Sequence, residues 1–147
     1  MNFKMKIKKL NERAIIPTYG TEFAAGADLY SCEENEIKIA AGETRIIHTG
    51  IAMEIPQGYV GLIYARSGLS TKRGLAPANK VGVIDADYRG EIMVALYNQS
   101  GAEQTVGVGE RVAQIVFTRY DMAEFEVVDE LDSTERGEGG FGSTGSK

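Results

Sequence analysis

Short apolar stretches, interrupted by glycines and polar turns, dominate this sequence. They are rich in Val, Ile, Tyr and Thr, residue types that favour β-strands, and they cover residues 36–39, 44–55, 59–64, 81–85, 91–98 and 111–119. Few windows hold a helical period for more than two turns. The best helical candidate is residues 67–73, which Gly74 would end. For a chain of 147 residues, this pattern predicts one all-β domain, a sandwich or jelly roll, with one short helix.

Residues 92–97 form a stretch that is apolar on both faces. An outer strand would alternate apolar and polar residues, but this one reads IMVALY. Either both faces are covered within the domain, or one face packs against another subunit.

The scarcity of cysteine and histidine narrows the possible chemistry. With one of each, Cys32 and His48, the chain cannot build a Cys/His zinc cluster. His48 is the only candidate base for a Ser/His/Asp triad, yet it lies in a strand-like run without a nucleophile motif. We therefore expect His48 to be structural or exposed. Hydrolytic chemistry would then depend on carboxylates, arginines and a magnesium ion.

Charge and hydropathy restrict the partners. The net charge of −5 argues against a general nucleic-acid binder, and a polyphosphate substrate would need local cations and backbone N–H groups. No apolar run approaches the roughly 18 residues of a membrane span. The basic N-terminus is not followed by an apolar signal core, and a lone Cys32 fits a reducing compartment. We expect a cytoplasmic protein that binds neither membrane nor nucleic acid.

The C-terminal segment differs in character from the rest of the chain. Residues 129–147 contain few large apolar side chains, so we expect them to be mobile without a ligand. The sequence therefore divides into a domain at 1–128 and an arm at 129–147. Within the arm, RGEGGFGSTG could be a linker. Alternatively, Arg136 and the glycines could bind an anion, and the lone aromatic residue Phe141 could stack on a base.

Two further segments combine turn signals with polar side chains. The stretch GVIDADYRGE at 82–91 predicts a β-hairpin, with Asp85 at a strand end where its carboxylate could deprotonate a water. In residues 64–74, Arg66, Ser67 and Gly68 lie at the start of the expected helix. They could bind an anion at its N-terminus, or Ser67 could serve only as its N-cap.

Taken in order, these segments resemble the five motifs of the homotrimeric dUTPase family. The motifs of this chain are AGADLYS at 25–31, ARSGLSTKRG at 65–74, GVIDADYRGEI at 82–92, GERVAQIVF at 109–117 and RGEGGFGSTG at 136–145. The resemblance covers nearly the whole chain and implies a distorted jelly-roll β-barrel with a flexible C-terminal arm.

The resemblance also implies a reaction and roles for residues of the third motif. The enzyme would hydrolyse dUTP to dUMP and pyrophosphate, limiting uracil incorporation into DNA and supplying dUMP for dTMP synthesis. Asp85 would activate the attacking water, and Tyr88 would pack on the deoxyribose and exclude a ribose. The residues that would recognise the base are Asn79, Gly82, Val83 and Met93, with Phe141 covering it.

For the phosphates, the resemblance implies a separate set of residues and a metal. The α- to γ-phosphates would contact Arg66, Ser67, Gly68, Gln114, Arg136, Ser143 and Thr144. Asp28 would help to position Mg²⁺ through water. Family members form trimers in which each site draws on three subunits and the arm of one subunit closes it.

Two other functions remain open at this stage. A dCTP deaminase of the same fold would need a glutamate near the base, and Glu91 is the glutamate of the predicted hairpin. A binding protein would retain the nucleotide without releasing pyrophosphate.

Overall fold

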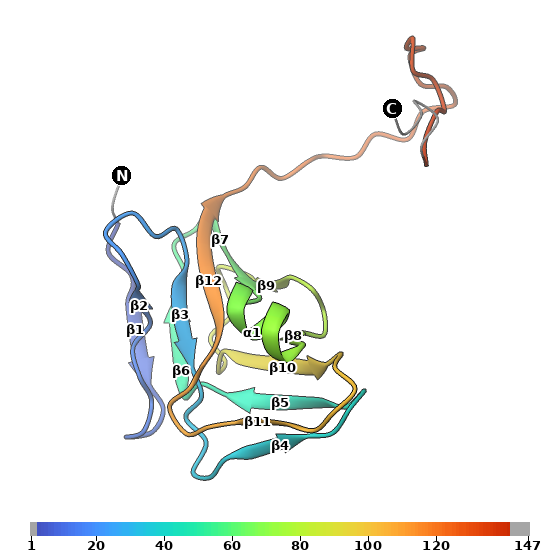
Figure 1. Ribbon diagram of the computed structural model, residues 1–147. Helices are drawn as coiled ribbons and strands as arrows, with labels where there is room; N and C mark the ends of the chain where they lie inside the picture. The colour runs from blue at the N-terminus through green and yellow to red at the C-terminus, as the bar shows by residue number, and fades with distance from the viewer. Residues whose placement is uncertain (1–2, 142–147) are drawn as a thin grey trace.

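The computed structural model describes residues 3–141, which form four antiparallel sheets and one helix (Figure 1). The largest sheet has the order β2 (Thr18–Tyr19), β3 (Ala27–Tyr30), β12 (Arg111–Arg119), β7 (Tyr59–Tyr64), β9 (Gly82–Ile84). A second has the order β5 (Thr44–His48), β10 (Met93–Asn98), β8 (Leu75–Pro77). Two-stranded sheets pair β1 (Lys6–Lys9) with β6 (Ile51–Glu54) and β11 (Gln104–Val106) with β4 (Ile37–Ile39). The helix is α1 (Ser67–Arg73).

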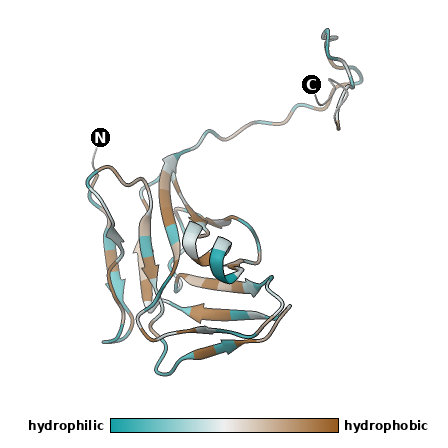
Figure 2. Cartoon of the chain, in the orientation of Figure 1, coloured by the Kyte–Doolittle hydropathy of each residue, from teal (hydrophilic) through white to brown (hydrophobic). Residues whose placement is uncertain are grey.

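One hydrophobic core draws on both larger sheets. Leu29 and Ile115 of the five-stranded sheet and Ile47 and Leu96 of the three-stranded sheet are completely buried in the same cluster. Apolar and polar residues succeed one another along the strands (Figure 2), as expected when one face of each sheet is buried. Each buried leucine or isoleucine stabilises the fold by about 1.5–3 kcal/mol. The chain is thus a distorted jelly roll, and the all-β prediction is confirmed.

Burial alternates along strand β10 although residues 92–97 of the sequence are apolar. Val94 and Leu96 are buried, whereas Met93 is 42% exposed. Opposite Ala95 on β5 lies Ile46, which is 52% exposed. The prediction that both faces of this strand are covered within one domain is therefore wrong. Packing of this outer face against another subunit stays a prediction.

Helix α1 has the predicted bounds and the predicted end. Gly74 follows it with a φ of 66°, and its N–H donates to the Ser70 carbonyl at 3.1 Å. This left-handed cap suits glycine. The N-cap is Arg66 and has no side-chain cap hydrogen bond, so the interpretation of Ser67 as an N-cap serine is wrong. Ser67 is instead the first helical residue, with an exposed side chain.

The predicted hairpin at 82–91 does not have the expected strand pairing. Strand β9 pairs only with β7, while β10 pairs with β5 and β8. The turn between them therefore crosses from one sheet to the other. A sequence pattern identifies two strands and a turn, but the choice of partner strand is decided by non-local packing.

The last strand ends at Arg119, and residues 120–141 run away from the body without strand or helix (Figure 1). Along this segment Met122, Phe125 and Val127 are at least 86% exposed. Large apolar side chains displayed in a row usually mark a contact surface. Within the described part of the chain, no helix is long and apolar enough to cross a membrane.

Candidate active site

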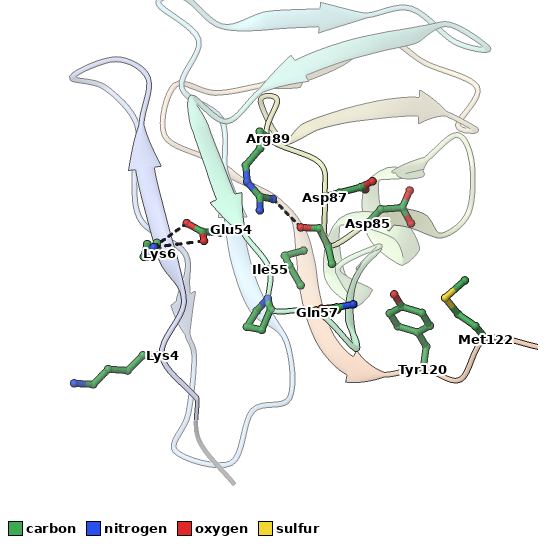
Figure 3. Close-up of a pocket in the computed structure, with 12 residues that line it drawn as sticks. Lys4, Lys6, Glu54, Ile55, Gln57, Asp85, Asp87, Arg89, Tyr120 and Met122 are labelled. Atoms are coloured by element: carbon green, nitrogen blue, oxygen red, sulfur yellow. Dashed lines mark hydrogen bonds and ion pairs between the residues drawn. The ribbon is translucent and has the colours of Figure 1, made fainter.

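The turn between β9 and β10 presents Asp85 and Tyr88 at the surface. Asp85 directly follows β9, and its carbonyl accepts a hydrogen bond from the Tyr88 N–H at 3.2 Å. The Tyr88 hydroxyl donates to the Glu91 carbonyl at 2.9 Å, and the Arg89 guanidinium donates to the Ala86 carbonyl at 2.7 Å. The turn is therefore held by its own hydrogen bonds, and the Asp85 carboxylate points outward (Figure 3).

A small cleft lies between β9 and β10 on one side of this turn. Its volume is about 220 Å³, and it is lined by Val83, Ile84, Asp85, Tyr88, Glu91 and Met93. Asn79 lies close by, because a Cβ added at Gly82 would be 3.4 Å from the Asn79 side-chain nitrogen. The structure thus gathers the predicted base and sugar residues of the body around one cleft.

A larger hollow of about 710 Å³ lies against the same turn (Figure 3). Its lining includes Asp85, Asp87 and Arg89 of the turn, Lys4 near the N-terminus and Tyr120 at the start of the C-terminal segment. Asp85 therefore lines both hollows, and Tyr120 brings the root of the arm close to the turn.

A second cluster contains the predicted phosphate and metal residues. The Asp28 carboxylate, on β3, accepts hydrogen bonds from the Arg66 Nε at 2.8 Å and the Arg111 Nη1 at 3.4 Å. On β12, Gln114 pairs in register with Asp28, and its amide donates to the Ala65 carbonyl at 2.9 Å. The Gln114 amide, which lies among apolar neighbours in the sequence, thus has a hydrogen-bond partner.

The second cluster also leaves donors free for an anion. Ser67 and Gly68 follow Arg66 at the start of α1 and are exposed. Arg111 was not among the expected residues. Arg111 lies in the same motif as Gln114, which could have marked it as a candidate. Only the pairing of β12 with β3 brings Arg111 to Asp28.

The two clusters lie toward opposite ends of β7. Ile84, just before Asp85, pairs with Gly61 near the start of β7, whereas Arg66 follows the far end of that strand. At the roughly 3.3 Å rise of a strand residue, the two side chains originate on the order of 15–20 Å apart. Within one chain, Asp85 and Arg66 therefore belong to two separate clusters.

The arm carries the remaining predicted residues. Arg136 donates to the Gly139 carbonyl at 2.9 Å within a local turn, and Phe141 is fully exposed. Neither residue is packed on the body. Ser143 and Thr144 lie outside the described residues.

His48 and Glu91 form an unexpected pair behind the turn. The His48 Nδ1 lies 2.9 Å from Glu91 Oε2, and 48% of the His48 side chain is exposed, in agreement with a structural or exposed histidine. The hydrogen bond with Glu91 raises the pKa of His48 above its ordinary value of 6.5. No sequence pattern predicts this contact, because the residues are 43 positions apart.

The carboxylates of the body do not form a direct metal cage. Among residues 3–141, no group of three or more His, Cys, Asp or Glu side chains could hold a metal ion. Asp28 is already bonded to two arginines. This arrangement is compatible with a magnesium ion that keeps most of its water ligands, and a role for Asp28 beside such an ion stays a prediction.

Comparison with known proteins identifies the family. The dUTPase family model matches residues 12–145. This chain belongs to the dUTPase family. It is 51% identical to the deoxyuridine 5′-triphosphate nucleotidohydrolase of Nautilia profundicola, over 97% of this chain and 99% of that protein. The corresponding enzyme of Syntrophotalea carbinolica is 44% identical over 96% of both chains.

Solved dUTPase structures share the fold. The dUTPase of Staphylococcus bacteriophage 80alpha with dUPNHPP superposes with a TM-score of 0.89 at 30% identity, covering 98% of this chain and 99% of that one. A mutant dUTPase from phage phi11 of S. aureus, described with a structural Mg(II) ion, has a TM-score of 0.79 at 26% identity. The match covers 88% of this chain and 99% of the phage chain.

Proposed function

We propose that this chain hydrolyses dUTP to dUMP and pyrophosphate, the activity that the names of its relatives state for them. The observation that carries this proposal is the cleft between β9 and β10, where Asp85 and Tyr88 lie beside the free edge of β9. This activity would limit uracil incorporation into DNA and supply dUMP for dTMP synthesis.

Base recognition relies on backbone groups in this proposal. Strand β9 is the edge of its sheet, so the N–H and C=O groups that alternate residues direct away from β7 are available to a ligand, and they include those of either Gly82 or Val83. Uracil presents one ring N–H donor flanked by two carbonyl acceptors, a pattern that such an edge can match. Met93 on the facing strand and Asn79 beside Gly82 complete the pocket. Its small volume disfavours the methyl group of thymine.

Sugar recognition and water activation come from the turn. The Tyr88 ring provides an apolar surface for the deoxyribose and leaves no space for a 2′-hydroxyl. The exposed Asp85 carboxylate holds a water and accepts its proton as the oxygen attacks the α-phosphorus, and pyrophosphate leaves in line. Mg²⁺, when bound to the triphosphate, neutralises the charge that develops on its oxygens.

The phosphates require residues from another copy of the chain. Because Asp85 and Arg66 start on the order of 15–20 Å apart along β7, we infer a shared site in a homotrimer. One subunit supplies the turn. A neighbour supplies Arg66, Ser67, Gly68 and Gln114, with Asp28 placing the metal through water. The exposed outer face of β10 offers an apolar surface for such a contact.

The arm of residues 129–147 closes the site in this proposal. Arg136, Ser143 and Thr144 would bind the γ-phosphate, and the unpacked Phe141 would cover the uracil. The domain at 1–128 would then hold the rest of the site. Closure would exclude bulk water and align the triphosphate for attack. A cytoplasmic location, where these nucleotides are found, completes the proposal.

The environment of Glu91 disfavours a deaminase. Its two carboxylate oxygens accept from the Gly50 N–H at 2.8 Å and contact His48 at 2.9 Å. A deaminase would need a glutamate free to exchange protons with the base.

A pyrophosphate-release assay comparing dUTP, dTTP, dCTP and UTP, with and without Mg²⁺, tests the proposal. We expect efficient release from dUTP alone and a large loss on chelation of the metal. Comparable turnover of dTTP or UTP would contradict the assignment of the cleft. Nucleotide binding without release would favour a binding protein, and ammonia release from dCTP would favour a deaminase.

A further inference from the structure

Glu91 connects the β9–β10 turn to the turn between β5 and β6. One carboxylate oxygen accepts a hydrogen bond from the Gly50 N–H at 2.8 Å, and the other contacts the His48 Nδ1 at 2.9 Å. The Glu91 side chain is only 22% exposed. A charge-assisted contact of this kind is stronger than a bond between neutral groups, so the side chain anchors the end of the turn.

The anchor rests on a rigid support. Gly50 has a φ of 67°, and a Cβ added there would come 2.9 Å from both Ala14 and Cys32. The Thr49 hydroxyl is buried and donates to the Ile92 carbonyl. The β5–β6 turn is therefore tightly packed on the body and cannot shift to follow a displaced Glu91.

Tyr88 depends on the backbone that this anchor holds. Its hydroxyl donates to the Glu91 carbonyl at 2.9 Å. Its ring folds back over Gly90 so closely that a Cβ there would overlap the hydroxyl. The orientation of the ring is thus fixed by the position of the Glu91 carbonyl and by the absence of a side chain at residue 90.

We propose that Glu91, held by His48 and the Gly50 N–H, is a positioning residue that sets the placement of Tyr88 and thereby the preference for deoxyribose over ribose. The inference rests on the proposed function, in which the Tyr88 ring packs against the sugar. Glu91 acts through Tyr88 and does not itself touch the sugar.

The charges around the anchor support this role. His48 faces two carboxylates: Glu91 through its ring, and Glu33, which accepts from the His48 backbone N–H at 2.8 Å. The hydrogen bond with Glu91 raises the pKa of His48, so the imidazole holds a proton more readily beside the anchor than in water.

The test compares kcat/KM for dUTP and UTP in the full-length enzyme and its variants. Glu91→Ala removes the anchor and is expected to lower the dUTP/UTP ratio about tenfold. In Glu91→Gln the amide oxygen can accept from Gly50 while its NH₂ donates to a neutral His48. At alkaline pH this variant should keep the ratio within about twofold of the wild type. A folded Glu91→Ala enzyme with an unchanged ratio would overturn the proposal.

Two further variants keep the test decisive. Tyr88→Phe removes the hydroxyl bond without touching the anchor, and should lower the ratio as Glu91→Ala does. If Glu91→Ala does not fold, an unchanged ratio in Tyr88→Phe overturns the proposal. Glu103→Ala, which removes a carboxylate from an exposed ion pair with Lys38, is the control and should leave the ratio unchanged. A wild-type enzyme without preference for dUTP over UTP would instead contradict the proposed function.

Discussion

Asp85 owes its exposure to the position it takes at the end of β9. The strand ends at Ile84, and the turn that follows is held by the bonds of Tyr88 and Arg89 to backbone carbonyls. The carboxylate is therefore available to a water without having to support the turn through its own side chain.

Replacement of Asp85 by Asn tests its role as general base. An amide has nearly the same shape but cannot accept the proton of the water, so kcat should fall roughly 10²–10⁴-fold. Affinity for a non-hydrolysable dUTP analogue, measured by calorimetry, should change little. Retention of full turnover would remove Asp85 from the mechanism.

His48 makes the stability of the fold depend on pH. Its pKa is raised in the folded state by the hydrogen bond with Glu91. The stabilisation is therefore fully present below the unfolded value of about 6.5 and is lost as the pH rises through the folded-state pKa. We expect the Tm difference between wild type and His48→Gln to shrink as the pH rises above about 6.5, at fixed protein concentration. A difference that is constant with pH would show that the pair does not respond to the charge of His48.

At the scale of elements, α1 depends on the glycine that ends it. Gly74 has a φ of 66°, and a Cβ there would lie 2.9 Å from the backbone N and the Cβ of Ser100. Gly42 has a similar φ of 75° but open space around it. The two glycines therefore separate backbone strain from steric overlap.

Gly42→Ala should cost about 1–2 kcal/mol, the penalty for a left-handed residue with a Cβ. Gly74→Ala should cost more, because Ser100 must also move. Urea unfolding of the two variants at equal protein concentration measures the loss in the free energy of unfolding for each. Equal losses would mean that the segment around Ser100 moves without a further energetic cost.

The turn between β9 and β10 joins two sheets, and this has a functional consequence. Since its flanking strands are paired elsewhere, they do not close against each other, and the cleft between them stays open. A regular hairpin with the same residues would consume the backbone groups that the proposed recognition of uracil requires.

At the scale of the whole molecule, the separation of Asp85 from Arg66 along β7 predicts complementation between subunits. Mixed trimers of Asp85→Asn and Arg66→Gln chains should regain activity, because some sites combine an intact Asp85 with an intact Arg66 from a different chain. After random reassembly of equal amounts, about a quarter of sites should be active. Pyrophosphate release before and after co-refolding measures this. Two variants that stay inactive together would place both residues in one subunit's site.

Deletion of residues 136–147 tests the arm. The described part of this segment makes local contacts within its own turn, so its removal should leave Tm and the number of subunits in the oligomer unchanged. Turnover of dUTP should fall by orders of magnitude, because the γ-phosphate contacts and site closure are lost. A large fall in Tm on deletion would instead assign the arm a structural role.

The amino-acid sequence by itself determined the local features of this protein. Strand-forming runs, the helix at Ser67–Arg73 with its glycine end, and a His48 that is structural or exposed all follow from residue type and short-range spacing. The five ordered motifs also identified the family, which the match over residues 12–145 confirms.

Only the tertiary structure decided how distant segments meet. The sequence could not show that β9 and β10 join different sheets, that Arg111 meets Asp28, or that Glu91 meets His48. Each of these contacts joins residues far apart in the chain. Because many strand pairings bury similar apolar area, local pattern does not distinguish among them, and the packing of the whole core selects one.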